Sequence, residues 1–359
     1  YAGGGAISSG AHEELRQIQE ECSIPVATTT MGKGSVDEEH PLTIGPIGYY
    51  MGKRGATRYL KSMVQSADVI LLVGNRTNQN GTDSWTLLPE GSTYIHIDID
   101  PMEIGRNYES IRLVGDAKLS LRALKESLKK YDLNKREKNR ALIEEEIANA
   151  RKAHLDEAKS VKTSNQSPLR IERFLAELEK QLSDDHIVVA DASLSSVWIA
   201  NYIKATGTRK FIFPRGLAGL GWGLPLAMGA KLAKPDRKVF CLVGDGGFAH
   251  VWSELETCTR EGIDVVVAVI NNKVLAYQKL AEQARWGKYT SACDFTAVDH
   301  AKIAEACGVK GLRIESPNEI AKSLQEAFST EGSVVIDLIV DPNCIPPIPF
   351  MGELESLEM

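Results

Sequence analysis

The chain has 359 residues, of which 42 are Lys or Arg and 48 are Asp or Glu, so its formal net charge is −6. At roughly 150 residues per domain, this length predicts two domains, each large enough to bury a core of its own. The apolar content of 43% and the charged content of 25% are close to globular averages, which excludes a disordered chain, a collagen and a coiled coil. The acidic balance argues against nucleic acid or an anionic membrane as the main partner.

The compartment is predicted from patterns that the sequence lacks. No window approaches the ~18 consecutive apolar residues that a membrane span needs, and residues 1–10 lack the layout of a signal peptide. The six cysteines are scattered, with no CxxC pair and no histidine at the spacing of a zinc site. We therefore expect a cytoplasmic protein with reduced thiols. Because the first residue is Tyr1 rather than Met, we also expect a processed product or a piece of a longer chain.

Short apolar runs rich in β-branched residues alternate with helical patterns along the chain. Such runs are typical of strands buried on both faces of a parallel sheet. The alternation predicts an α/β protein with two three-layer α/β/α domains and mainly parallel sheets. The strand-like runs cover 69–73, 94–98, 187–190, 239–243, 265–270 and 334–340, and the clearest helical patterns cover 11–22, 171–182 and 318–328.

A charged segment at 134–165 separates the two predicted domains. It contains Lys135-Arg-Glu-Lys138 and Glu144-Glu-Glu146 but few large apolar residues, which predicts a solvated helical connector rather than a nucleic-acid surface. The first domain would then span 1–133 and the second 166–345. The prolines that open the tail at 346–359 cannot continue a helix or a central strand, so we expect this tail to lie over the surface.

Polar residues follow two of the strand-like runs in the second domain. The run 239–243 leads into Gly244-Asp245-Gly246, at the carboxyl end of a strand, where ligands bind in open α/β sheets. Glycines let the backbone approach an anion, and the N–H groups of a following helix point at it. The run 265–270 ends in Asn271-Asn272, and amide oxygens are ligands that Mg²⁺ accepts. Each element alone is a common turn, but together they predict a pocket for a metal ion and a diphosphate.

The spacing of 27 residues from Asp245 to Asn272, with a helical segment between them, resembles the thiamine-diphosphate binding motif. By this resemblance, Asp245, the side-chain oxygen of Asn272 and the backbone carbonyl of Val274 would ligate Mg²⁺. The residues expected to present backbone groups to the diphosphate are Gly244, Gly246, Gly247 and Phe248.

The likeness covers essentially the whole chain and is to acetolactate-synthase-like enzymes. Tyr1-Ala-Gly-Gly-Gly5, Met31-Gly-Lys-Gly34 and the segment 94–101 look like the middle domain of that family. The segment 215–225 looks like the stretch that braces the thiazolium ring, where Leu220 would wedge the cofactor into its bent shape. A core leucine in a Gly-rich turn is the alternative for Leu220.

Two further segments of the second domain have both a functional and a structural interpretation. The hydroxyls of Ser193, Ser195 and Ser196 match the family's other diphosphate-side loop, although Ser193 could instead cap the following helix. Tyr277 lies in a segment expected over the cofactor, where it could line the substrate pocket or belong to an amphipathic packing helix.

Two departures from the family limit what the resemblance implies. The stretch 75–83 is rich in Asn and Thr where the family has an acidic, Arg-rich stretch, so the FAD of the family's middle domain is doubtful here. The glutamate that activates the cofactor comes from an N-terminal domain of a neighbouring subunit in this family. No glutamate here stands in a segment resembling that domain, so we assign no catalytic residue and expect this chain alone to be inactive.

The resemblance therefore implies a thiamine-diphosphate-dependent 2-oxo acid decarboxylase and carboligase with Mg²⁺. It further implies a pyruvate-like 2-oxo acid, a carbonyl acceptor, and a homodimer or homotetramer with the active site between subunits. Alternatives within the family are a simple decarboxylase, an aldehyde lyase and a 1,2-diketone hydrolase. Outside catalysis, the chain could be the cofactor-binding subunit of a split enzyme. A dinucleotide site at Gly3-Gly-Gly5 is disfavoured because the GxGxxG spacing is missing.

Overall fold

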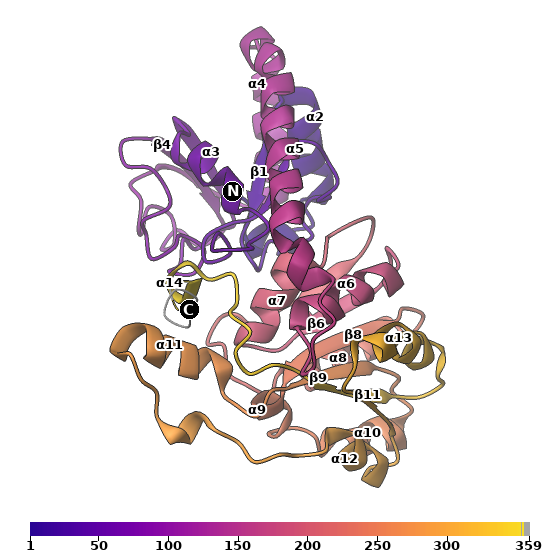
Figure 1. The fold of residues 1–359 in the computed structure, drawn as a ribbon. Helices are drawn as coiled ribbons and strands as arrows, with labels where there is room; N and C mark the ends of the chain where they lie inside the picture. The colour runs from indigo at the N-terminus through magenta and orange to yellow at the C-terminus, as the bar shows by residue number, and fades with distance from the viewer. Residues whose placement is uncertain (353, 355–359) are drawn as a thin grey trace. The chain divides into compact units, whose positions relative to one another are not determined.

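The computed structural model describes residues 1–352 and 354 (Figure 1). The chain divides into two compact units, Tyr1–Glu157 and Ala158–Met359. The boundary falls inside the segment 134–165 that the sequence marks as a connector. Both units combine helices with parallel strands, which confirms the predicted α/β class.

Parallel strands form the centre of the first unit. β1 (Val26–Thr28) pairs with β2 (Thr43–Pro46). A second group has the order β3-β4-β5, with β3 at Val69–Val73, β4 at Thr93–Asp98 and β5 at Ile111–Val114. Ala2 forms parallel bridges to both Thr28 and Val73 and thereby joins the two groups. The predicted runs 69–73 and 94–98 are confirmed as β3 and β4.

The helices of the first unit flank these strands. Asp116 is the N-cap of the helix at Ala117–Leu128, and its side chain accepts a hydrogen bond from the Leu119 N–H, as an N-cap residue does. The helices and 3₁₀ turns are α1 (Gly4–Ser8), α2 (His12–Cys22), η1 (Arg58–Leu60), α3 (Lys61–Gln65), α4 (Ala117–Leu128) and α5 (Asn134–Lys162). The helical pattern at 11–22 is confirmed as α2.

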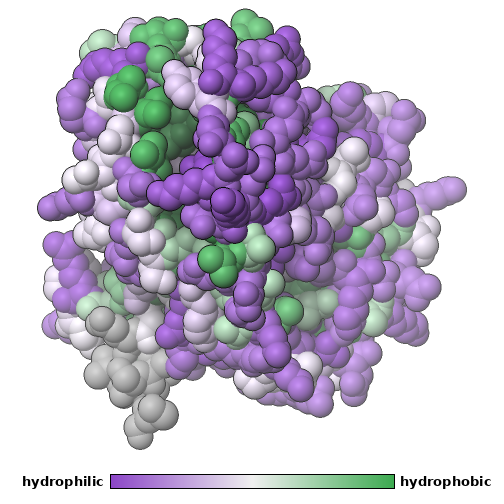
Figure 2. All heavy atoms as spheres, turned by 90° about the horizontal axis from the view of Figure 1, so that it is seen from above, coloured by the Kyte–Doolittle hydropathy of each residue, from purple (hydrophilic) through white to green (hydrophobic). Residues whose placement is uncertain are grey.

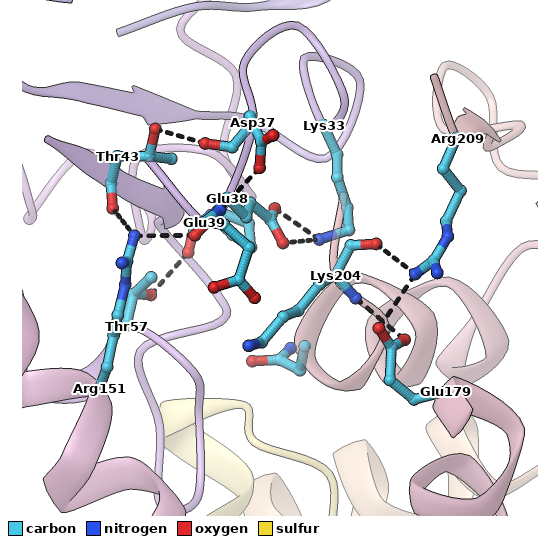
Figure 3. A network of polar contacts seen from close by, with 12 residues as sticks. Lys33, Asp37, Glu38, Glu39, Thr43, Thr57, Arg151, Glu179, Lys204 and Arg209 are labelled. Carbon is cyan, nitrogen blue, oxygen red and sulfur yellow. Dashed lines mark hydrogen bonds and ion pairs between the residues drawn. The ribbon is translucent and has the colours of Figure 1, made fainter. Parts of the chain in front are cut away.

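The charged segment forms the 29-residue helix α5 and also packs onto the first unit. Ile147 and Ala150 are buried in that unit's core. Next to them, Arg151 donates hydrogen bonds to the backbone carbonyls of Glu38, His40 and Thr43 at 2.8, 3.0 and 2.7 Å (Figure 3). The segment is therefore helical, as predicted, and most of its length is part of the first unit rather than a connector alone.

One six-stranded parallel sheet organises the second unit. Its order is β10-β11-β9-β8-β6-β7. The strands are β6 (Ile187–Ala190), β7 (Lys210–Ile212), β8 (Val239–Gly244), β9 (Val266–Asn271), β10 (Lys310–Ile314) and β11 (Val334–Ile339). The four central strands correspond to the four runs predicted for this domain. They are buried almost throughout, as expected for a sheet covered on both faces.

Helices cover both faces of this sheet (Figure 1). Side chains from α8, α10 and α12 share one core with the sheet, whereas α6 packs against α7 and α13. The elements of the two faces and of the loops are α6 (Ile171–Gln181), α7 (Leu194–Tyr202), α8 (Gly223–Ala233), α9 (Asp245–Phe248), α10 (Glu254–Glu261), α11 (Ala276–Trp286), η2 (Ser291–Cys293), α12 (His300–Ala306), η3 (Pro317–Glu319), α13 (Ile320–Ser329) and α14 (Pro349–Gly352). The helical patterns at 171–182 and 318–328 are confirmed as α6 and as η3 with α13.

Hydrophilic residues predominate on the face drawn in Figure 2, where hydrophobic residues gather in a few groups. Within the described residues, no helix combines the length and the apolar character that crossing a membrane requires. The segment 346–352, expected to lie over the surface, keeps the side chains of Ile348 and Met351 away from solvent. Residues 353 and 355–359 of the expected tail lie outside the described part.

Candidate functional site

In the sheet of the second unit, the order in which strands are added reverses at β6. From β6 the chain adds β7 on one side, and then β8 is added on the other side. Such a switch point opens a crevice at the carboxyl ends of the strands, where open α/β sheets bind ligands. The segments that leave this edge after β6, β8 and β9 begin at 191, 245 and 272. Most of the predicted site residues stand in these three segments.

Asp245 follows β8 as the first residue of the short helix α9. Its carboxylate accepts hydrogen bonds from the backbone N–H of Gly246 at 2.8 Å and from that of Lys273 at 2.7 Å. The residue is only 6% exposed, and burial raises the pKa of Asp245 to about 6 against the opposing effect of these N–H groups. A buried carboxylate without a charged partner among these contacts favours a cation beside it.

The turn after β9 lies against Asp245. Lys273 has a left-handed backbone with φ of 59°, and its N–H group makes the bond to Asp245. Asn272 and Val274 flank Lys273, so all three predicted metal-binding residues belong to one local cluster. Carboxylate, amide and carbonyl oxygens are the hard donors that Mg²⁺ prefers. No group of three or more His, Cys, Asp or Glu with the arrangement of a metal site occurs in the part of the chain that the structure describes.

The glycines around Asp245 have different surroundings. A Cβ added at Gly246 would lie 2.8 Å from Leu275 Cδ2, and one added at Gly247 would overlap with the carboxylate of Asp191. A Cβ at Gly244 would meet nothing within 4 Å. Packing thus requires glycine at 247, whereas at 246 the end of the Leu275 side chain would have to move. Phe248 is fully buried and its ring lies edge-on to His300, so its side chain belongs to the core; a backbone contact to a diphosphate stays a prediction.

The serines after β6 stand at the start of α7. Ser193 makes no side-chain cap to this helix, so the capping role considered for it is not observed. Ser196 donates a hydrogen bond to the Ser193 carbonyl at 2.9 Å and accepts one from Arg215 Nη1 at 3.0 Å. Ser195 is buried. Arg215 follows β7, the neighbour of β6, and the sequence motif contained it without marking it as a site residue.

Leu220 and Tyr277 complete the predicted set. Leu220 is 37% exposed, so a substantial part of its apolar side chain is accessible. The next three residues donate their backbone N–H groups to Asp191, a carboxylate that sequence reasoning missed. Its only signal was an acidic residue directly after a fully apolar strand. Tyr277 is half-buried in the first turn of α11, directly after the turn that carries Asn272 and Val274.

In the first unit, the Gly-rich turn at 3–5 is explained by packing of the chain on itself. A Cβ at Gly5 would lie 2.6 Å from the Cα of Gly74, and one at Gly3 would overlap with the Gly74 carbonyl. The following Asn-rich stretch bonds internally, since Asn75 accepts from the Thr77 N–H and Asn78 accepts from the Gly81 N–H, both at 2.9 Å. The turn and the Asn-rich stretch are thus explained by packing and by internal hydrogen bonds.

Comparison with known proteins identifies relatives of both units. Two protein-family models match: the thiamine pyrophosphate enzyme central domain over residues 1–124 and the C-terminal TPP binding domain of thiamine pyrophosphate enzymes over residues 191–338.

Curated proteins match over nearly the whole chain. A "probable acetolactate synthase large subunit" of Methanococcus aeolicus is 35% identical over 96% of this chain and 59% of that protein. One of Methanocaldococcus jannaschii is 33% identical over 99% and 60%, and the acetolactate synthase large subunit of Parasynechococcus marenigrum is 30% identical over 97% and 55%. The chain thus spans no more than 60% of the length of these relatives.

Proposed function

The chain belongs to the family of thiamine pyrophosphate enzymes. Thiamine pyrophosphate is another name for thiamine diphosphate, and we propose that the second unit binds this cofactor together with Mg²⁺. The observation that carries this proposal is the buried Asp245 carboxylate, which is bonded to the turn containing Asn272 and Val274. A dication beside Asp245 would offset the cost of burying its charge. The oxygen donors of this cluster match the preference of Mg²⁺.

Each predicted residue then has a role in binding or orientation. Asp245, Asn272 and Val274 hold the metal ion, and the serines at the start of α7 together with Arg215 face the anionic end of the cofactor. The Leu220 side chain supports the thiazolium ring of the cofactor, and Tyr277 lines the substrate pocket. The remaining backbone donors to the diphosphate are Gly244, Gly246, Gly247 and Phe248. The bound cofactor supplies the carbanion chemistry, while the protein supplies position and electrostatics.

We propose for the whole protein the decarboxylation of a pyruvate-like 2-oxo acid coupled to ligation with a carbonyl acceptor. The names of the relatives, which are acetolactate synthase large subunits, support this reaction. We further propose a cytoplasmic homo-oligomer with the active site between subunits. The exposed side chains of Leu217, Trp222 and Trp252 close to the site support this arrangement, because large exposed apolar groups commonly mark interfaces. The glutamate that activates the cofactor is not assigned to this chain.

Thermal unfolding with and without thiamine diphosphate and Mg²⁺ tests the proposed site. A ligand present at about 100 times its Kd adds about 2.7 kcal/mol to the free energy of unfolding. For a unit of this size, we expect Tm to rise by roughly 5–10 °C. Asp245→Asn should lose most of this rise because it removes the charged metal ligand. The matched control is Asp236→Asn, since Asp236 is an exposed aspartate. Equal shifts for Asp245→Asn and the parent would contradict the site.

Product analysis tests the proposed reaction. Protein purified from its native source would be incubated with pyruvate, with and without added aldehydes. We expect carbon dioxide and a ligated 2-hydroxy ketone or 2-hydroxy-2-methyl-3-oxo acid. Free acetaldehyde as the sole organic product would instead identify a simple decarboxylase.

A further inference from the structure

Asp191 connects three segments of the second unit. It directly follows β6 and is fully buried. Its Oδ2 accepts a hydrogen bond from the Gly221 N–H at 3.0 Å, and its Oδ1 accepts from the N–H groups of Trp222 and Gly223, both at 3.1 Å. Its own N–H donates to the Leu242 carbonyl of β8 at 2.9 Å. One residue therefore connects the beginning of α8, through its carboxylate, to β6 and β8, through its backbone.

The three donors are N–H groups that a helix start leaves without partners. The first N–H groups of any helix have no acceptor within the helix, and an anion is favoured there by the helix dipole. No side chain near α8 in sequence caps this helix. Asp191 supplies the anion from 30 residues away. Since its carboxylate already takes these three donors, they are not available to the diphosphate of the cofactor.

The carboxylate also lies against the segment 246–248, which is proposed to bind the diphosphate. A Cβ added at Gly247 would overlap with Asp191 Oδ2, and one added at Gly221 would lie 3.4 Å from the Gly247 carbonyl oxygen. A Cβ at Gly223 would lie 3.0 Å from the Asp191 Cβ. Asp191 is thus packed between the glycine turn 221–223 and the segment 246–248.

We infer that Asp191 is a positioning residue that holds the turn after Leu220, and so the Leu220 side chain, in place before the cofactor binds. The inference rests on the proposed function, because it assumes that Leu220 supports the cofactor ring. Asp191 is fully buried and its carboxylate is occupied by backbone N–H groups, so in this proposal it makes no contact with the cofactor. It acts through the backbone of residues 221–223, and its effect should therefore concern the ring rather than the diphosphate.

Two probes separate these effects. Thiamine diphosphate carries the ring, whereas inorganic diphosphate presents only the anionic end. Binding of each, with saturating Mg²⁺, would be measured by calorimetry and by tryptophan fluorescence, for which Trp222 is a local reporter. For Asp191→Asn we expect the affinity for thiamine diphosphate to fall about tenfold or more, because one acceptor of buried N–H groups is lost. The affinity for inorganic diphosphate should stay within about threefold of the parent, since its donors lie elsewhere.

A double-mutant cycle with Leu220→Ala then tests the route. If Asp191 acts through Leu220, Asp191→Asn should have little further effect on thiamine diphosphate affinity when Leu220 is already Ala. The matched control is Asp185→Asn, at the exposed opposite end of β6. If Asp191→Asn fails to fold, Gly221→Ala perturbs the same turn, because Gly221 has a φ of 88° that disfavours alanine.

The outcomes distinguish the inference from the proposed function. Equal loss of both ligands, additive effects in the cycle, or unchanged thiamine diphosphate affinity in both turn variants would overturn the role of Asp191. Failure of the parent protein to bind either ligand would overturn the proposed function instead.

Discussion

Three buried carboxylates near the carboxyl edge of the second sheet differ in how their charge is compensated. Asp191 accepts three backbone N–H groups. Asp337 accepts from Arg313 Nη1 at 2.7 Å and from Asn271 Nδ2 at 2.8 Å. Asp245 has two backbone donors, and the nearby Asp337 further raises its pKa. Of these three carboxylates, Asp245 has the least compensation of its negative charge, so a bound cation would be most favourable beside it. This agrees with its proposed role as a metal ligand.

His300 offers a pH-dependent test of the packing behind this site. The residue is 3% exposed, and among the described residues neither ring nitrogen finds a hydrogen-bond partner. Its ring lies edge-on to that of Phe248 at 5.5 Å. Burial lowers the pKa of His300 below its usual 6.5, while the facing carboxylates of Asp337 and Asp299 oppose this shift and Arg313 adds to it.

The direction of the pH effect follows from proton binding. Below pH 6.5 the unfolded chain binds a proton at His300 more readily than the folded chain, so the free energy of unfolding should fall as the pH drops. His300→Phe keeps a ring beside Phe248 but removes the titrating group, and we expect a flatter decline between pH 7 and pH 5. Urea unfolding across this range is the measurement. His250→Gln, at an exposed position, is the control and should decline as the parent does. A parent-like decline in His300→Phe would contradict the assignment.

At the scale of elements, edge position and short length explain which strands the sequence did not predict. The six predicted runs are β3, β4, β6, β8, β9 and β11, which all have neighbours on both sides. The unpredicted β1 and β2 are largely buried but only three and four residues long, too short to form a distinct apolar run. The unpredicted β5, β7 and β10 are sheet edges, where side chains face solvent and the apolar requirement weakens. All four residues of β5 are exposed. The apolar runs of long buried strands are therefore readable in a sequence, whereas edge strands depend on tertiary context.

The same limit applies to the site. Asp245 and Asn272 were predicted because each directly follows a readable strand at a spacing typical of a known motif. The contacts of Asp191 with residues 221–223 and of Arg215 with Ser196 join segments that are 19 or more residues apart. Neither pair forms a local pattern. The sequence thus predicts the proposed binding residues that stand on strand ends, but not the long-range contacts that hold the loops between them.

The contact between helix α5 and the rest of the first unit leads to a prediction about stability. Arg151 lies at the centre of its contact with the first unit, where one guanidinium nitrogen serves three carbonyls of the segment 38–43. Burial lowers the pKa of Arg151, yet the guanidinium stays charged at any ordinary pH. A lysine side chain is one bond shorter, so its ammonium would not reach the position of this nitrogen without a shift of the helix or of the segment 38–43. We expect Arg151→Lys to lower the free energy of unfolding of the first unit by about 1–3 kcal/mol.

Urea unfolding and hydrogen exchange of residues 38–43 measure this effect. The exchange of these amides should become faster in Arg151→Lys, because the carbonyls beside them lose their partner. Lys152→Arg makes the reverse exchange at the next, exposed position and should change neither quantity. Equal stability of both variants would show that α5 is held by its apolar contacts alone.

For the whole molecule, the two units divide the proposed work unequally. The predicted cofactor and metal residues all lie between Ser193 and Tyr277 and so belong to the second unit. The first unit matches the family's central domain, but Gly3 and Gly5 of its Gly-rich turn are accounted for by packing against Gly74. Binding energy of the cofactor should therefore stabilise the second unit directly, and the first unit only as far as the two are coupled.

Hydrogen exchange of the intact chain tests this division. With thiamine diphosphate and Mg²⁺ present, opening of the second unit must first release the ligand, so its slowest amides should become more protected. We expect the added protection in β6, β8 and β9, and little change in β3 and β4. Asp245→Asn should abolish it throughout, while the exposed Asp236→Asn should not. Added protection spread evenly over both units would mean that they unfold as one cooperative body. Added protection confined to the first unit would contradict the proposal that the cofactor binds the second unit.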